Sequence, residues 1–155
     1  MAGILISTQA CLASAENLSI PVEPGVWRYE RSTMGIHIPG VGTQIHKFLN
    51  AQRGHNLGDC FSPGTDLDLG KAVERLNGGA ACEISEVHRR TNDIAFKAKC
   101  GEQYGFYHVT WEEKPYKHFL LQMRIVNQTL SNGDFESVTA ISGTWQNANM
   151  CPAIK

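Results

Sequence analysis

The chain has 155 residues, of which 42% are hydrophobic, and its formal net charge at pH 7 is −1. This length and this hydrophobic content are enough for one domain with its own core. Because the basic residues form no stripe or cluster, nucleic acid is not an expected partner. No apolar stretch is long enough to cross a bilayer, so no integral membrane span is predicted.

The chain starts with an uncharged segment, MAGILISTQACLASA, that contains the apolar run 4–6. The segment ends in Ala13-Ser14-Ala15, the small-residue pattern that signal peptidases cut. We therefore expect residues 1–15 to be a signal-peptide remnant and residues 16–155 to form a single disulfide-stapled β domain. No Lys or Arg precedes the apolar run, which leaves an apolar tail of the folded domain as the alternative.

The next segments predict short strands and one helix. Gly25–Ser32 alternates with two aromatic residues on one face, which indicates a strand, and Thr43–Gln52 is a candidate second strand. The Gly-rich stretch Thr33–Gly42 is expected to connect them. Asp66 is the expected N-cap of a short helix that ends at Gly78. The apolar side of this helix comprises Leu69, Ala72, Val73 and Leu76.

The segment Ala81–Cys100 predicts a β-hairpin, because Thr91, Asn92 and Asp93 are turn-forming residues. With the turn centred on Thr91, Cys82 lies directly opposite Cys100. Facing side chains of antiparallel strands are almost close enough for a disulfide, so a Cys82–Cys100 bond needs little adjustment. Two unrelated buried thiols are the alternative. The same register places Glu86 opposite Phe96.

Two more alternating segments follow, Gln103–Glu113 and Lys117–Thr129, and Asn132-Gly133 is a strong hairpin pattern leading to Phe135–Trp145. The alternation predicts one shared apolar face for the first two segments, with Tyr107, Val109 and Trp111 on one strand facing Phe119, Leu121, Met123 and Ile125 on the other. A meander with one apolar face must be covered or must curl. We therefore predict a mainly β fold, an antiparallel meander that forms a curved sheet or a small β-barrel with one short helix. A β-sandwich is the alternative.

Cysteine content predicts the compartment. Of the five cysteines, removal of residues 1–15 eliminates Cys11 and leaves four. An even number of cysteines is typical of oxidising compartments, so we expect a periplasmic or secreted protein. If Cys82 pairs with Cys100, the remaining pair is Cys60–Cys151.

Several short motifs together resemble those of one family of small exported bacterial proteins. EPGVWRYE, the segment Cys60-Phe61-Ser62-Pro63, the pair Cys82 and Cys100, and the ending from Gly143 to Cys151-Pro152 occur in the same order there. The chain is similar in this respect to the domain-of-unknown-function 3617 family. The resemblance implies an exported, four-cysteine, β-rich domain and no activity. Arg28 departs from the pattern of that family.

No catalytic motif of a hydrolase, zinc protease or nucleotide-binding loop is present, so an enzyme is not predicted. His108 and His118, with Glu112, are the nearest approach to a metal site, but solvent-facing strand residues are the simpler interpretation. Neither a metal nor a cofactor is expected.

We predict a non-catalytic binding protein. Its expected ligand is an apolar small molecule or a lipid. Such pockets are mostly apolar with a few polar groups. The candidate pocket residues are Tyr107, Trp111 and Met123, although packing of the core is the stronger explanation of apolar strand residues. The alternative is an interaction or inhibitor domain for an envelope protein, which would use the expected loops Met34–Gly42 or Arg53–Asp59.

Overall fold

The computed structural model describes residues 18–37, 53–127 and 135–148 of the chain. This part is mainly β-structure. The strands are β1 (Ser19–Ile20), β2 (Gly25–His37), β3 (Arg53–Phe61), β4 (Leu67–Asp68), β5 (Cys82–Arg89), β6 (Asp93–Cys100), β7 (Gln103–Trp111), β8 (His118–Asn127) and β9 (Phe135–Asn147), and the helix is α2 (Leu69–Leu76).

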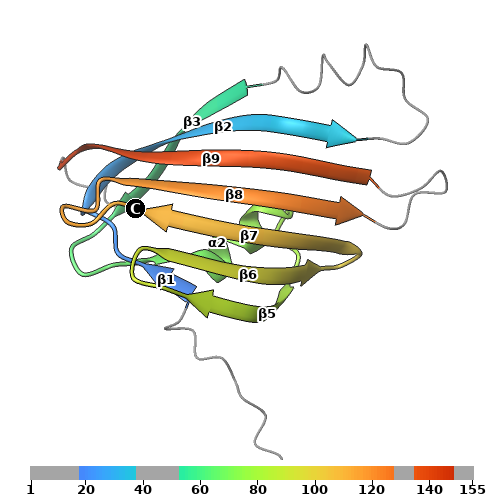
Figure 1. The fold of residues 1–155 in the computed structure, drawn as a ribbon. Helices are drawn as coiled ribbons and strands as arrows, with labels where there is room; N and C mark the ends of the chain where they lie inside the picture. The colour runs from blue at the N-terminus through green and yellow to red at the C-terminus, as the bar shows by residue number, and fades with distance from the viewer. Residues whose placement is uncertain (1–17, 38–52, 128–134, 149–155) are drawn as a thin grey trace, which may run out of the picture.

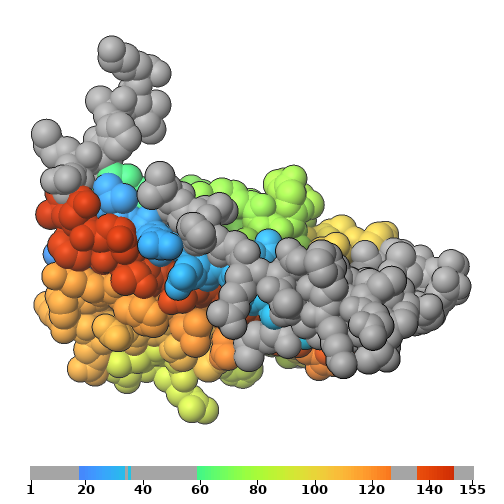
Figure 2. All heavy atoms as spheres, turned by 90° about the horizontal axis from the view of Figure 1, so that it is seen from above, coloured from blue at the N-terminus to red at the C-terminus, as the bar shows by residue number. Residues whose placement is uncertain are grey.

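Seven of the strands form one antiparallel sheet in the order β3-β2-β9-β8-β7-β6-β5, and β1 pairs with β4 in a separate two-stranded sheet. The large sheet is twisted, and α2 lies against one of its faces (Figure 1). Seen from above, the green atoms of the helical segment lie on one side of the sheet (Figure 2). We call this side the inner face and the opposite side the outer face.

The predicted fold class is confirmed, in its curved-sheet form. β3 and β5 stand at the two ends of the strand order and do not pair with each other, so the described strands form no closed barrel. The second layer consists of α2 and the small β1–β4 pair. A sandwich of two comparable sheets is therefore not what the described residues form.

Alternation along the strands produces the core. The register aligns Tyr107 with Met123 and Trp111 with Phe119, as predicted for two strands sharing one apolar face. Trp27 is fully buried on the inner face, where its ring packs against Phe61 and Phe119. These large aromatic residues supply much of the apolar area removed from water on folding.

The cysteine hairpin is confirmed, with one correction. Cys82 lies opposite Cys100, and the two form a disulfide with a Cα–Cα distance of 4.3 Å. The register then shifts between Ser85 and His88, because the strand contains a bulge. Glu86 therefore does not face Phe96 as predicted. It adopts a left-handed backbone conformation (φ 51°), and its carboxylate contacts Lys97 instead.

Two segments predicted to be loops are strands. β2 continues to His37 because β9 pairs with it over that whole length, so the expected connection beginning at Thr33 is wrong in its first part. Arg53–Asp59, an expected binding loop, lies within β3 and pairs with β2. Both segments are polar or rich in glycine, and pairing with a neighbouring strand overrides their weak β-propensity. The predicted strand Thr43–Gln52 and the turn Asn132-Gly133 lie outside the described residues.

The helix begins two residues later than predicted. Asp68, not Asp66, is the N-cap, and its side chain accepts a hydrogen bond from the backbone N–H of Lys71 at 3.1 Å. Leu67 is buried, and it pairs with Ile20 in the small sheet, which keeps the chain extended past Asp66. The predicted end is confirmed, since Gly78 follows the C-cap Asn77 with a positive φ.

Candidate functional site

An apolar pocket of about 200 Å³ lies between α2 and the inner face of the sheet, and it is half open to solvent. The helix, over its whole length, and Leu67 of β4 supply one wall, and β2, β8 and β9 supply the other. The pocket is lined by Tyr29, Leu67, Leu69, Ala72, Arg75, Leu76, Phe119, Leu121 and Ile141. We call it the helix–sheet pocket.

The pocket exists because the helix is short and carries a small residue on its inner side. Leu69 and Val73 are its buried residues, and they anchor it to the core. Ala72, by contrast, offers only a methyl group where a larger side chain would fill the space. An eight-residue helix therefore leaves part of the inner face uncovered.

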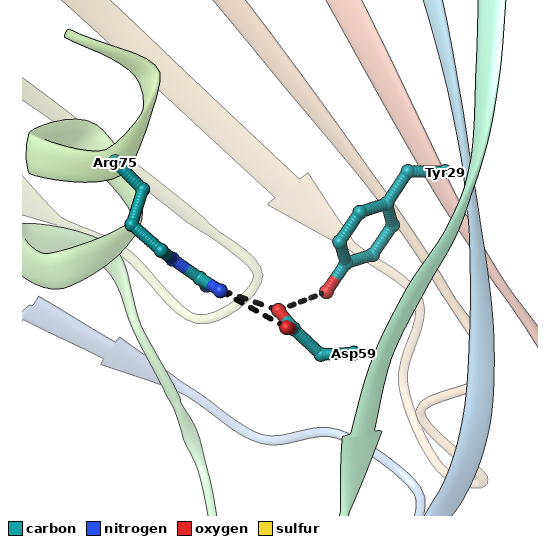
Figure 3. A network of polar contacts seen from close by, with 3 residues as sticks. All are labelled: Tyr29, Asp59 and Arg75. Atoms are coloured by element: carbon teal, nitrogen blue, oxygen red, sulfur yellow. Dashed lines mark hydrogen bonds and ion pairs between the residues drawn. The ribbon is translucent and has the colours of Figure 1, made fainter. Parts of the chain in front are cut away.

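Three polar residues join the helix to the sheet at this pocket (Figure 3). Arg75 donates two hydrogen bonds to the Asp59 carboxylate, from Nη1 to Oδ1 and from Nη2 to Oδ2, each at 3.0 Å. The hydroxyl of Tyr29 donates to Oδ2 of Asp59 at 2.9 Å. α2, β3 and β2 each supply one member, so this network ties the helix to the edge of the sheet. We call it the Tyr29–Asp59–Arg75 network.

The network fixes the charges of its members. The hydrogen bonds from Arg75 hold the pKa of Asp59 below its ordinary value, despite partial burial. Burial, and then the negative charge of Asp59, raise the pKa of Tyr29 well above its ordinary value. The carboxylate is therefore ionised and the phenol protonated at neutral pH, which is the combination that this hydrogen bond requires.

None of the three predicted pocket residues lines the helix–sheet pocket. Tyr107, Trp111 and Met123 are all buried, with at most 7% of each side chain exposed. The ring of Tyr107 stacks on Phe96, and its hydroxyl accepts a hydrogen bond from Asn77 at the end of the helix. Burial raises the pKa of this tyrosine. These contacts are those of core residues that hold the helix on the sheet.

The predicted residues border two other hollows instead. Tyr107 and Met123 border a wider, shallower hollow of about 460 Å³ on the outer face. Trp111 borders a polar one of about 510 Å³ near the turns at one end of the sheet. The outer hollow is larger than the helix–sheet pocket, but it is more open. We regard the smaller pocket as the better site because enclosure, not area, removes a ligand from water.

The outer hollow is also crossed by a row of side chains that satisfy one another. Lys97 pairs with Glu86 at 2.7 Å, and its ammonium lies 5.4 Å from the centre of the Phe106 ring. On the other side of that ring lies the guanidinium of Arg124, at 5.9 Å, which pairs in turn with Glu136. The row therefore consists of two ion pairs, one on each side of the Phe106 ring, whose charges cancel.

Of the three candidate metal ligands, His118 and Glu112 contact each other, and His108 does not join them. His108 lies opposite Gln122 and contacts Asp93, whereas His118 contacts Glu112 and the hydroxyl of Ser142. Within the described residues, no group of three or more potential ligands is arranged to hold a metal ion. Cys60 is disulfide-bonded, and its predicted partner Cys151 lies outside the described residues.

Sequence reasoning missed both Asp59 and Arg75. Asp59 stood in an expected loop, and Arg75 was an ordinary polar residue on a predicted helix. One pattern was informative: Arg75 falls one turn from Ala72 and next to Leu76, both on the predicted apolar side. A cation at the edge of an apolar helical stripe indicates a position near a buried interface.

Comparison of the chain with family models, with curated proteins and with solved structures found no match. The resemblance to the domain-of-unknown-function 3617 family therefore stays a prediction. Among the described residues, no helix has the length and apolar character needed to span a membrane.

Proposed function

We propose that the protein is an exported, non-catalytic binding protein that takes a small apolar molecule into the helix–sheet pocket. The observation that carries this proposal is the pocket itself, whose walls are almost entirely aliphatic and aromatic. Ligand sites are concave, mostly apolar and supplied with a few polar groups. The Tyr29–Asp59–Arg75 network provides such groups beside it.

The size of the pocket limits the ligand. Its volume of about 200 Å³ is below the roughly 300–1,000 Å³ of pockets that enclose drug-sized molecules. A slender chain suits this space better than a fused ring system, and the open side lets part of the ligand extend into solvent. We therefore propose a short aliphatic molecule, or the end of a longer one, as the ligand.

The proposed location is the periplasm or the extracellular space. The Cys82–Cys100 disulfide supports this location, since such bonds persist in oxidising compartments and are rare in reducing ones. The predicted processing after Ala15 concerns residues outside those described. Intact mass of protein recovered from the cell envelope would test it.

The binding proposal is tested by filling the pocket. Ala72→Leu places a larger side chain among the lining residues, so we expect binding of octanol to be abolished. The fold should tolerate the change, at a cost below about 1.5 kcal/mol, because the added atoms enter existing space. Titration followed by NMR shifts of the Leu69, Leu76 and Ile141 methyl groups measures binding at the site.

Ala140→Leu is the matched control, because Ala140 lies on the outer face opposite Gln122. It should leave octanol binding unchanged. If octanol does not shift these methyl groups in the unmodified protein, or if Ala72→Leu binds it equally well, the proposed function is wrong.

Binding of an envelope protein is the second candidate, and it has less support. Tyr104 and Phe106 are the large hydrophobic residues exposed in the described part of the chain. Each already has a lysine over its ring. Aromatic anchors of protein interfaces enter pockets on the partner, and these two are partly covered.

A further inference from the structure

We infer that the ligand of the helix–sheet pocket is a short aliphatic carboxylate, and that Arg75 binds its carboxylate group at the mouth of the pocket. This inference rests on the proposed function, because it concerns the polar end of a molecule whose apolar end occupies that pocket. It adds a chemical class and a recognising residue.

The first step is the charge of the lining. Arg75 is the one charged residue among the described residues that line this pocket, and the others are apolar apart from the Tyr29 hydroxyl. Arg75 lines the pocket, and 60% of its side chain is exposed. A guanidinium at the open side of an apolar pocket matches a molecule with an alkyl chain and an anionic end.

The second step is the number of donors. A guanidinium has five N–H groups and no acceptor. Asp59 takes two of them, and no other acceptor within the described residues contacts Arg75. Three N–H groups therefore remain for a ligand. A planar carboxylate matches their fixed geometry, and an ammonium group cannot accept from them.

The third step is the orientation of Arg75. Both oxygens of Asp59 bind the guanidinium, and Oδ2 also accepts a hydrogen bond from Tyr29 (Figure 3). This arrangement holds an otherwise flexible side chain in one position, so less side-chain entropy is lost when a ligand binds. It has an opposing effect, because the negative charge of Asp59 also repels a second carboxylate. The two effects oppose each other in Asp59→Asn, where loss of orientation would weaken binding and loss of the negative charge would tighten it. An Asn oxygen can still accept from Arg75, so we expect the loss of charge to dominate.

The experiment compares octanoate, octanol and octylamine, which share a chain length and differ in the polar end. We expect octanoate to bind the unmodified protein most tightly and octylamine most weakly. Arg75→Met should weaken octanoate binding at least tenfold and leave octanol binding within about twofold. Asp59→Asn keeps the shape and removes the competing charge, so it should tighten octanoate binding severalfold.

Arg124→Met is the matched control, since Arg124 also pairs with a carboxylate, that of Glu136, but on the outer face. It should change none of the three affinities. A purely structural role of the Tyr29–Asp59–Arg75 network would make both pocket variants bind all three molecules less well. Thermal melts would confirm that both variants are folded.

Three outcomes overturn the inference. If octanoate and octanol bind equally, or if Arg75→Met weakens both to the same extent, Arg75 does not select a carboxylate, and the proposed function survives. If Asp59→Asn weakens octanoate binding while the protein stays folded, the proposed geometry is wrong. Failure of all three molecules to bind would instead overturn the proposed function.

Discussion

The inner face of the sheet is packed so closely at Gly143 that it leaves no room for a Cβ atom. Gly143 lies opposite Phe119 in the pairing of β8 with β9, and a Cβ built at Gly143 would overlap the ring of Phe119. That ring has little freedom to move, because it contacts Trp27 and Tyr29 as well. Glycine in a strand marks such a close approach.

We therefore expect Gly143→Ala to destabilise the protein by about 1–3 kcal/mol, the usual cost of inserting a group into a packed core. Gly35→Ala is the control, since nothing lies within 4 Å of the corresponding Cβ. That change should be neutral or slightly stabilising, because alanine restricts the unfolded chain. Denaturant unfolding measures both. Equal effects of the two substitutions would contradict the role assigned to Phe119.

At this scale the sequence predicted burial better than polar contacts. Alternation of apolar and polar residues placed Phe119, Leu121 and Met123 on the inner face, and all three are buried. The pair formed by Asp59 and Arg75 was not predictable in the same way. The pair joins an edge strand to a helix that follows it in the chain. The local sequence pattern does not indicate which polar residues contact each other after folding.

The helix α2 depends on its contacts with the sheet. An isolated helix of eight residues is not stable in water. Burial of Leu69 and Val73 supplies the main attachment. The Asp68 cap satisfies a backbone N–H, and the Asp59–Arg75 ion pair joins the helix to β3. The sequence predicted the existence of the helix. It misplaced the cap because Leu67 and Asp68 continue as β4.

The pH dependence of this attachment follows from Asp59. Its pKa in the folded protein is lowered by Arg75, so the pair stabilises the fold fully above the unfolded pKa of about 4. That contribution is lost as the pH falls through the lower, folded value. We expect Asp59→Asn to cost about 1 kcal/mol at pH 7, since Arg75 is largely exposed, and progressively less as the pH falls below about 4.

The measurement is the free energy of unfolding of Asp59→Asn and the unmodified protein across this pH range. In an Arg75→Met background, the same substitution should show a much weaker pH dependence, because the group that lowers the pKa is absent. A cost that stays constant from pH 7 to pH 2 would show that the effect comes from packing and not from the ion pair.

The sheet formed by the described strands is open, with β3 at one edge and β5 at the other. β3 is paired on one side with β2, and β5 on one side with β6. Most of β5 is exposed, so few buried contacts hold it. A bulge at Glu86 and the charged residues around it make this edge a poor template for another strand. The meander was predictable because its turns are local, whereas the pairing of β2 with β9 joins distant segments without a local pattern.

The disulfide compensates for the weak attachment of β5, because it bonds this edge strand to buried Cys100 on β6. The cysteines are 18 residues apart, and closing a loop of this length stabilises a protein by about 3 kcal/mol in the chain-entropy description.

We expect Cys82→Ala with Cys100→Ala to lower the free energy of unfolding by about that amount. Amide exchange should accelerate in β5 first, since local opening begins where buried contacts are fewest, while β8 and β9 remain protected until global unfolding. Exchange that accelerates equally in β5 and β9 would mean that the bond stabilises the domain as one unit and that this edge has no separate weakness.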